Sequence, residues 1–161
     1  MIDTFRGASR SSSPAMENII HGMFVVADVL SGDRVSQAAS RLLRTFGGFN
    51  ASAKQAYVAL LAEVTALTKS AAAEEDLRAG IDAEDASEVI VSVMLGAELF
   101  SSALADSKDV RARFARSWAI MLPAIVSDDS LAYYREFLAR QSMRGGASNR
   151  DTPAPEARPA P

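Results

Sequence analysis

The amino-acid sequence predicts an all-α protein, a bundle of about six helices followed by a disordered tail. Apolar residues recur in steps of three and four along most of the chain, which is the spacing of one helix face. Typical helix start and stop residues separate these stretches: Ser, Asp or Asn before them and Gly after them. No alternating β-branched run between hairpin turns occurs, so no strand is predicted.

Composition limits the possible functions. A chain of 161 residues is long enough for one domain with a core. The absence of Cys excludes disulfides, thiolate zinc sites and a Cys nucleophile. A net charge of -3, with no concentrated basic face, argues against a self-contained nucleic-acid binder. No uninterrupted apolar run approaches the roughly 20 residues that span a bilayer, and the N-terminus does not resemble a signal peptide. We therefore expect a cytoplasmic protein with no membrane segment.

The N-terminal part predicts a short helix end and one long helix. Residues 1–7 have the pattern of a helix that closes at Gly7. Ser13 is expected to cap the next helix, with Pro14 at its first position. The apolar stripe of that helix, which runs to about Leu30, comprises Met16, Ile19, Ile20, Met23, Phe24 and Ala27.

Two further helices follow. Asp33 is expected to cap the first, which ends at Gly47–Gly48 and whose predicted buried face is Val35, Ala38, Ala39, Leu42, Leu43 and Phe46. Asn50 or Ser52 begins the second, whose predicted buried face is Ala53, Ala56, Tyr57, Leu60, Leu61, Val64 and Leu67.

Residues 82–126 predict a central pair of long helices. Asp82 caps the first, whose main apolar face is Ala86, Val89, Ile90, Val93, Met94, Ala97, Phe100 and Leu104. A second apolar row on that helix is Val91, Leu95 and Leu99, and small residues lie between the rows. The second helix has the face Val110, Phe114, Trp118, Met121, Leu122 and Ile125. Pro123 predicts a kink or an end near Met121. A helix that is apolar on two sides is usually buried on two sides, which indicates a second copy of the chain.

The last helix is expected to be capped by Asp128 or Asp129, with Leu131, Tyr134 and Leu138 facing inward. Beyond Gln141 the composition changes to Gly, Ser, Pro and Ala with almost nothing apolar to bury. Residues 142–161 are therefore predicted to be a disordered Pro/Ala-rich tail.

Several passages resemble a known family. They are RVSQAASRLL (34–43), DLRAGIDAEDASE (76–88), VSVMLGAELF (91–100) and SWAIMLPAIV (117–126). Together with the order of helices, they resemble the C-terminal ligand-sensing and dimerisation region of tetracycline-repressor-type (TetR) transcriptional regulators. Within that family the likeness is closest to the γ-butyrolactone receptors of actinomycetes, and it covers about residues 1–142.

The resemblance implies a domain plan. Residues 1–12 would be the remnant of a connector helix and its link, and residues 13–141 the ligand-binding and dimerisation domain. The family's helix-turn-helix unit has no counterpart in these residues, so DNA would be reached only through a unit that is missing here. The implied protein is a regulator domain that senses a small apolar effector, without a cofactor or a metal. It is expected to be a fragment, a truncated regulator or a chain whose start codon is placed too late.

Candidate ligand-binding residues lie on the core faces of three helices that the resemblance places around a cavity. They are Ile20, Met23, Phe24, Tyr57, Leu61, Ile90 and Met94. Tyr57 stands where the resembled receptors have a Trp that faces the ligand, and its hydroxyl requires a partner when buried. The alternative is that these residues simply fill the core.

Candidate dimer-interface residues lie on the central pair of helices. They are Ser92, Leu95, Gly96, Leu99, Trp118 and Met121. Small residues allow two helices to cross closely, and two helices from each subunit would form a four-helix interface about a two-fold axis. The alternative is that both apolar rows pack within one subunit.

An enzyme is not expected. His21 is the only histidine, and with Glu17 and Asp28 it allows a metal or general-base hypothesis, although a solvated helix face explains the same pattern. Ser87, Ser92, Ser101, Ser102 and Ser117 have no nucleophile motif, and no phosphate-binding glycine loop occurs. Arg111, Arg113 and Arg116 are interpreted as solvated surface. The competing function is a helical protein-interaction module that acts by homo- or heterodimerisation without a small-molecule ligand.

Overall fold

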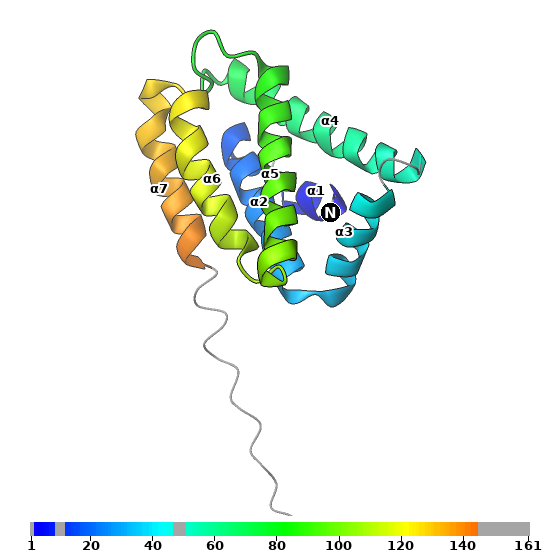
Figure 1. Ribbon diagram of the computed structural model, residues 1–161. Helices are drawn as coiled ribbons and strands as arrows, with labels where there is room; N and C mark the ends of the chain where they lie inside the picture. Colours follow the sequence, from blue (N-terminus) through cyan, green and yellow to red (C-terminus); the bar gives the residue numbers. More distant parts are fainter. Residues whose placement is uncertain (1, 9–11, 47–50, 145–161) are drawn as a thin grey trace, which may run out of the picture.

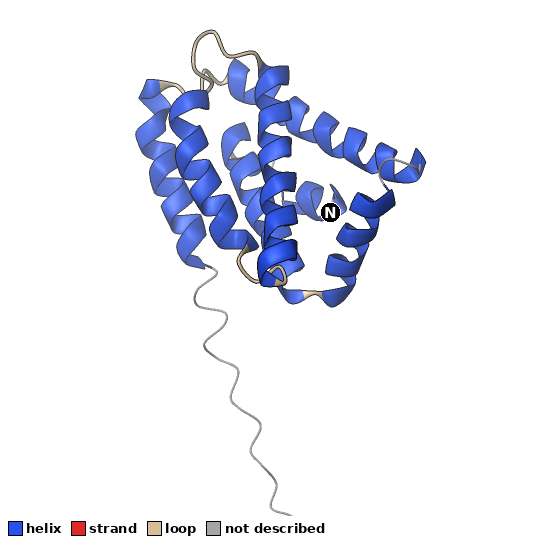
Figure 2. Ribbon diagram, viewed as in Figure 1, coloured by secondary structure: helices blue, strands red, loops and turns tan. Residues whose placement is uncertain are grey.

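The computed structural model describes residues 2–8, 12–46 and 51–144, and these described residues form seven helices and no strand (Figures 1 and 2). In chain order the helices are α1 (Ile2–Ala8), α2 (Ala15–Gly32), α3 (Arg34–Phe46), α4 (Ala51–Ala73), α5 (Ala83–Ala105), α6 (Val110–Ile125) and α7 (Asp128–Arg144). The all-α prediction is confirmed. The predicted stop at Gly47–Gly48 and the tail from residue 145 onward lie outside the described residues.

Helix α2 is the centre of the bundle. It packs against α1, α4 and α6 and makes smaller contacts with α3 and α7. Helix α6 lies between α5 and α7, and α4 crosses α5 and extends away from that layer toward α3 (Figure 1). Eleven of the 18 residues of α2 are buried, so this helix is covered on most of its circumference.

The face predicted for the helix at 110–125 is confirmed. All six of its residues are buried and pack into the main core: Val110, Phe114, Trp118, Met121, Leu122 and Ile125. The Trp118 indole donates a hydrogen bond from Nε1 to Sδ of Met23, 3.1 Å away on α2. This contact satisfies the only polar atom of a fully buried side chain.

Two predicted helix caps are confirmed and one is wrong. Asp82 accepts hydrogen bonds from the backbone nitrogens of Glu84 (2.7 Å) and Asp85 (3.0 Å), and Asp33 caps α3 in the same way. Ser13 does not cap α2. Pro14 occupies the N-cap position, and the Ala15 amide donates instead to Oε2 of Glu74, 2.8 Å away at the end of α4. A carboxylate from a distant part of the chain thus satisfies a free amide at the positive end of α2.

The ends of α6 and α7 also differ from the prediction. Pro123 lies inside α6, which continues to Ile125, so the predicted end near Met121 is wrong and the alternative of a kink stays a prediction. Pro123 stands in the last turn, whose carbonyls are capped by Arg78: its Nη2 donates to the Pro123 oxygen (2.9 Å) and its amide to the Ile125 oxygen (2.8 Å). Asp128 is the first residue of α7 rather than its cap, and α7 extends to Arg144, beyond the predicted boundary at residue 141.

Asp76 joins the α4–α5 connection to the start of α7. Its carboxylate accepts hydrogen bonds from Ser130 Oγ (2.6 Å) and the Tyr134 hydroxyl (2.5 Å), and its backbone oxygen accepts from the Ser127 amide (2.8 Å). Burial of the phenol and its bond to Asp76 raise the pKa of Tyr134 well above its usual range. The Tyr134 hydroxyl therefore remains a neutral donor throughout the physiological pH range.

The Asp76 cluster gives a stability prediction. Tyr134→Phe removes a donor from the Asp76 carboxylate and should lower the free energy of unfolding by about 1–3 kcal/mol. Tyr133→Phe is the matched control, because the exposed Tyr133 hydroxyl donates to Glu17 at the surface. It should change the unfolding free energy by about 0.5 kcal/mol or less. Urea denaturation measures both, and equal losses would contradict the special role of Asp76.

Candidate functional site

The predicted ligand-binding residues are mostly part of the close-packed core. Ile20, Met23, Phe24, Ile90 and Met94 are buried within a single apolar cluster. Leu61 packs against that cluster from α4 and is half-buried, as is Tyr57. Both the ligand-pocket prediction and the core-filling alternative require buried side chains, so ligand contacts by these residues, Tyr57 included, stay a prediction.

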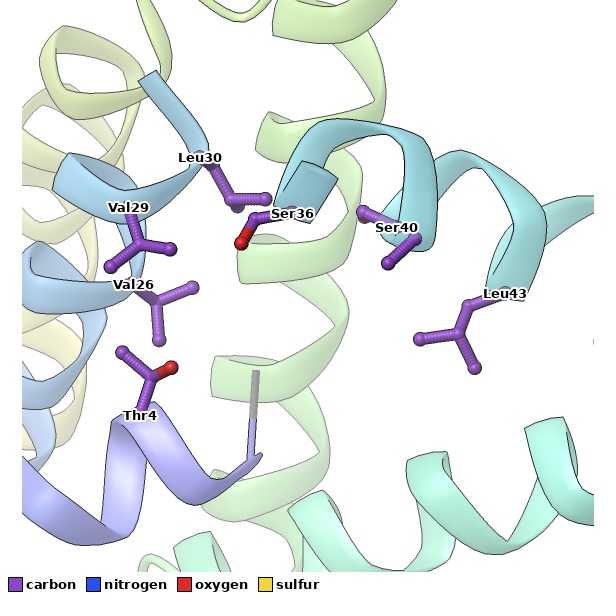
Figure 3. Close-up of a pocket in the computed structure, with 8 residues that line it drawn as sticks. Thr4, Val26, Val29, Leu30, Ser36, Ser40 and Leu43 are labelled. Atoms are coloured by element: carbon purple, nitrogen blue, oxygen red, sulfur yellow. The ribbon is translucent and has the colours of Figure 1, made fainter. Parts of the chain in front are cut away.

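A cavity lies elsewhere, between α1, α2 and α3 (Figure 3). Its volume is about 70 Å³, and none of the seven predicted residues lines it. The lining combines branched aliphatic side chains with hydroxyls: Thr4, Val26, Val29, Leu30, Ser36, Ala39, Ser40 and Leu43. Thr4 comes from α1 and the last four from α3, so the cavity joins the shortest helix of the bundle to α3.

The cavity was missed because α3 is oriented differently from the prediction. Val35 is 75% exposed, and Ala38, Ala39 and Leu42 are also exposed, whereas Ser40 is buried. Leu43 is half-buried, and the Phe46 side chain is outside the described residues. The predicted buried face is therefore wrong. Helix α3 turns its serine side inward because that side finds polar partners on α2 and α5.

Polar contacts hold α3 in this orientation. Gln37 Nε2 donates to the Leu30 oxygen (2.8 Å), and Ser40 Oγ donates to Oε1 of Glu98 (3.0 Å). Glu98 lies on α5 and is only 3% exposed. A carboxylate at such a position needs hydrogen-bond donors, since burying an unsatisfied charge is costly. A single Glu inside an apolar helix face was the sequence signal that could have indicated this contact.

A ligand of ordinary size requires the cavity to grow. Binding sites for drug-sized molecules have volumes of about 300–1,000 Å³, several times the 70 Å³ present. Helix α3 packs less extensively on the bundle than any other long helix and exposes much of its apolar surface. An outward displacement of α3 is therefore the movement that enlarges the cavity at the lowest cost in buried apolar area.

The Ser40–Glu98 contact gives a prediction about α3. Ser40→Ala removes a buried hydrogen bond and should accelerate amide hydrogen exchange throughout α3, with α6 unchanged. Ser70→Ala on α4 is the matched control, because Ser70 is exposed and bonds only to its own helix at Ala66. Mass-spectrometric hydrogen exchange measures both variants. Unchanged protection of α3 in Ser40→Ala would show that this contact does not hold the helix.

A second candidate site is the groove between α5 and α6. This open groove has a volume of about 430 Å³ and is lined by Val93, Gly96, Ala97, Phe100, Arg113, Arg116, Ser117 and Ile120. Ile120 is 78% exposed and Leu104 71%, and Val89, Leu99 and Phe100 are also exposed. A side chain added at Gly96 would meet no atom within 4 Å. This surface is mostly apolar, with Arg113 and Arg116 at its α6 side, and nothing among the described residues covers it.

The predicted interface residues divide into two groups. Ser92 and Leu99 are exposed on α5, and Leu95 and Gly96 are half-buried there. Trp118 and Met121 are buried inside the protomer, because that face of α6 packs against α2, where Trp118 bonds to Met23. Trp118, with 0% exposure, cannot contact a partner in this conformation. On α6 it is Ile120 and Ser117 that face the groove, and sequence analysis did not select them as interface residues.

Helix α5 also meets a length-and-composition criterion for a membrane-crossing helix, the only one among the described helices to do so. It has 23 residues and a mean hydropathy of 1.6 over its most apolar 18-residue window. Core helices of soluble proteins meet the same criterion, but only 28% of that window is buried here. Its apolar surface therefore extends well beyond what the protomer covers.

The polar residues singled out by sequence analysis form no catalytic arrangement. His21 Nδ1 lies 3.3 Å from Oε1 of Gln141 on α7. Within the described ranges, no group of three or more His, Asp or Glu side chains is placed to hold a metal ion. Ser101 donates to Asp109 (2.5 Å), and with Arg113 it holds the pKa of the Asp109 carboxyl below its ordinary value.

The interpretation of Arg111 as solvated surface is wrong. Its Nη1 pairs with Asp28 (2.5 Å), its Nη2 donates to the Gln141 backbone oxygen, and its guanidinium lies 4.7 Å from the centre of the Phe24 ring. Arg111 therefore ties α6 to both α2 and α7. Arg113 is also largely covered and pairs with Asp109 at 2.8 Å, while Arg116 is exposed.

Comparisons with known proteins identify the fold. No family model matches the sequence, and no curated protein matches it. A similar solved structure is full-length native TylP, a TetR regulator from Streptomyces fradiae, with a TM-score of 0.69 and 19% identity over 96% of this chain. The chain has a TetR-like fold.

A second matching structure comes from a study of the molecular basis for the control of antibiotic production by bacterial hormones. It has a TM-score of 0.66 and 22% identity over 78% of this chain. This chain spans 65% of the length of that protein and 70% of TylP. At sequence identities this low, the two matches establish the shared fold alone.

Proposed function

We propose that this chain is the small-molecule-sensing and dimerisation domain of a TetR-like transcriptional regulator that acts in the cytoplasm. The observation that carries the proposal is the correspondence of fold with TylP, a regulator, over nearly the whole chain. The chain spans 65–70% of the length of the matched structures, so the matches do not extend to a complete regulator. A DNA-binding role of the complete protein is therefore part of the proposal. DNA would be contacted through a helix-turn-helix unit for which these residues contain no counterpart.

Sensing is assigned to the cavity between α1, α2 and α3. Aliphatic side chains on α2 and Leu43 on α3 supply apolar contact, while Thr4, Ser36 and Ser40 supply hydroxyls that can bond to a carbonyl or hydroxyl of the effector. An effector that binds better when α3 is displaced shifts the population toward that state. Because Thr4 lies on α1, the same event changes the packing of α1, the helix that would lead to a DNA-binding unit.

The resemblance to butyrolactone receptors supplies the probe. A panel of γ-butyrolactones with alkyl side chains should raise the melting temperature of the protein. Ala39→Phe, which fills the cavity, should weaken binding at least about tenfold, the effect of roughly 1.4 kcal/mol. Ala38→Phe is the matched control, because Ala38 is an exposed neighbour that does not line the cavity.

Differential scanning fluorimetry followed by calorimetry measures these affinities. If Tyr57→Ala abolishes lactone binding while Ala39→Phe leaves it intact, the site lies among the residues predicted from the sequence and not in this cavity. If no lactone binds to the wild-type protein, this effector class is wrong.

Dimerisation is assigned to the α5–α6 groove, with a second copy of the chain as its occupant. Exposed Val89, Phe100 and Leu104 lie on one stripe of α5, and Ile120 faces the same groove from α6. Monomeric proteins rarely leave large contiguous apolar patches exposed. The open space at Gly96 allows a partner helix to approach the α5 backbone, and a two-fold axis through the groove would bury the same patch on both subunits.

Gly96→Leu tests the homodimer. A Cβ at this position meets no atom within 4 Å and the groove is open, so the fold should be retained, but the helix of a partner would be displaced. Light scattering after size exclusion should give twice the 17.1 kDa chain mass for the wild type and the single chain mass for Gly96→Leu. Ala132→Leu, at an exposed position of α7, should remain dimeric. A dimeric Gly96→Leu protein would remove this groove from the interface.

A helical interaction module without a ligand is the second candidate function. The observation that favours it is the contrast between the small α1–α2–α3 cavity, about 70 Å³, and the extensive uncovered surface on α5 and α6. A stable dimer through the groove, combined with no lactone binding in the fluorimetry above, would select this function over sensing.

A further inference from the structure

A polar pocket of about 150 Å³ lies between α2 and α7, and it is distinct from the cavity beside α1. Its residues are spaced by about one helical turn on each side, so that one stripe of α2 faces one stripe of α7. The α2 side consists of Ser13, Glu17, Asn18 and His21, and the α7 side of Phe137, Gln141 and Arg144. Neither the proposed sensing site nor the dimer groove uses any of these residues.

The walls of this pocket are held in position by other side chains. Glu17 accepts a hydrogen bond from the Tyr133 hydroxyl at Oε1, and Asn18 Nδ2 donates to the Ser13 oxygen (3.2 Å). The Gln141 backbone oxygen accepts from Arg111, which is anchored in turn on α2 through Asp28. A site whose groups are fixed beforehand loses less entropy when a ligand binds.

Three of the polar atoms that line the pocket have no hydrogen bond among the described residues. Gln141 is only 5% exposed, and its amide uses Oε1 toward His21 Nδ1 (3.3 Å) while Nε2 has no partner. If the amide oxygen and nitrogen were exchanged, one end would still be unused. His21 Nε2 and Glu17 Oε2 are the other two. The unused end of the Gln141 amide is not among the fully enclosed unpaired atoms of the described residues and lines an open pocket, so it is available to bond to a polar ligand there.

The charged side chains of the pocket indicate which charges a ligand should carry. Glu17 on α2 and Arg144 on α7 line the same space, yet no ion pair joins them within the described part of the chain. An anion would be repelled by Glu17 and a cation by Arg144, whereas a molecule carrying both charges satisfies both groups. Arginine binds carboxylates in a two-pronged geometry, and a carboxylate such as Glu17 accepts hydrogen bonds from an ammonium group.

We propose that the pocket between α2 and α7 binds a free α-amino acid. Arg144 contacts its carboxylate and Glu17 its ammonium group. The unused atoms of His21 and Gln141 bond to its remaining polar atoms, and Phe137 supplies an apolar wall. The bound amino acid bridges α2 and α7 beside the Arg111 anchor, so its occupancy stabilises the junction of α2, α6 and α7.

The test uses the whole chain and the twenty proteinogenic L-amino acids as probes. Differential scanning fluorimetry at millimolar concentration should show at least one that raises the melting temperature, and calorimetry should give one site per chain. Glu17→Gln and Arg144→Gln should each weaken its binding about tenfold to a hundredfold. Glu136→Gln and Arg135→Gln, at exposed positions of α7 outside the pocket, are the matched controls and should bind as the wild type does.

Two analogues of the amino acid test which residue of the pocket binds each of its two charged groups. The 2-hydroxy acid that corresponds to the best amino acid lacks the ammonium group, and the amino-acid amide lacks the carboxylate. The wild type should prefer the amino acid to both. The preference over the hydroxy acid should vanish in Glu17→Gln, and the preference over the amide should vanish in Arg144→Gln.

The proposal is overturned if no amino acid binds, if both variants bind as the wild type does, or if only one of the two charges affects binding. Ala39→Phe, which fills the cavity beside α1, should leave amino-acid binding unchanged. A loss of amino-acid binding in Ala39→Phe would place the ligand in that cavity and would also overturn the assignment to α2 and α7.

Discussion

The covering of α2 is the constraint on which the rest of the structure depends. This helix carries Met16, Met23 and Phe24 among many buried side chains, so it needs neighbours around most of its circumference. Helices α1, α4 and α6 supply most of that contact, and the Trp118 indole pairs with Met23 inside it. Because α1, α4 and α6 use much of their apolar surface to cover α2, they cover only part of the apolar surface of α5 and α3. The two proposed surfaces for partner and effector both follow from this uneven distribution.

The sequence predicts the elements whose neighbours require only apolar contact. The stripe from Val110 to Ile125 is buried as predicted, because a helix that packs on an apolar core needs no particular partner atom. The prediction from sequence is wrong where a long-range polar contact determines the orientation or the cap of a helix. Ser40 faces inward because Glu98 accepts its hydroxyl, and α2 is capped by Glu74 instead of Ser13. Such partners are 58 and 59 residues apart in the chain, and helical periodicity contains no information about them.

The candidate sites show the same division more strongly. The predicted ligand residues were selected as large apolar side chains on core faces, and such side chains pack against one another and leave no space. The cavity beside α1 is instead lined by a mixture of aliphatic and hydroxyl-bearing residues, such as Val26 and Ser36, and its α3 side lies outside the apolar core faces of the three helices that carry the predicted ligand residues. The exposed part of the dimer prediction, Ser92 and Leu99, could be selected because small and apolar residues lie close together on that side of α5. Trp118 could not be placed correctly, since a large aromatic residue suits an interface and a core equally well.

The two proposed ligand sites share α2 but act on different neighbours. Val26 and Leu30 line the cavity at one end of this helix, and Glu17 and His21 line the polar pocket at the other. Because α2 packs against more neighbours than any other helix and a packed core is not continuously deformable, displacing α2 would disturb more contacts than displacing one of its neighbours. Conformational change must therefore occur in the weakly packed element at each site. At the cavity that element is α3, whose position depends on a few polar bonds and which shares the cavity with α1. At the polar pocket α7 is anchored by Arg111 and by Tyr134, so binding there adds stability without a comparable displacement. Under the two proposals, the fold separates a site that would transmit a signal toward α1 from a site that would stabilise the bundle.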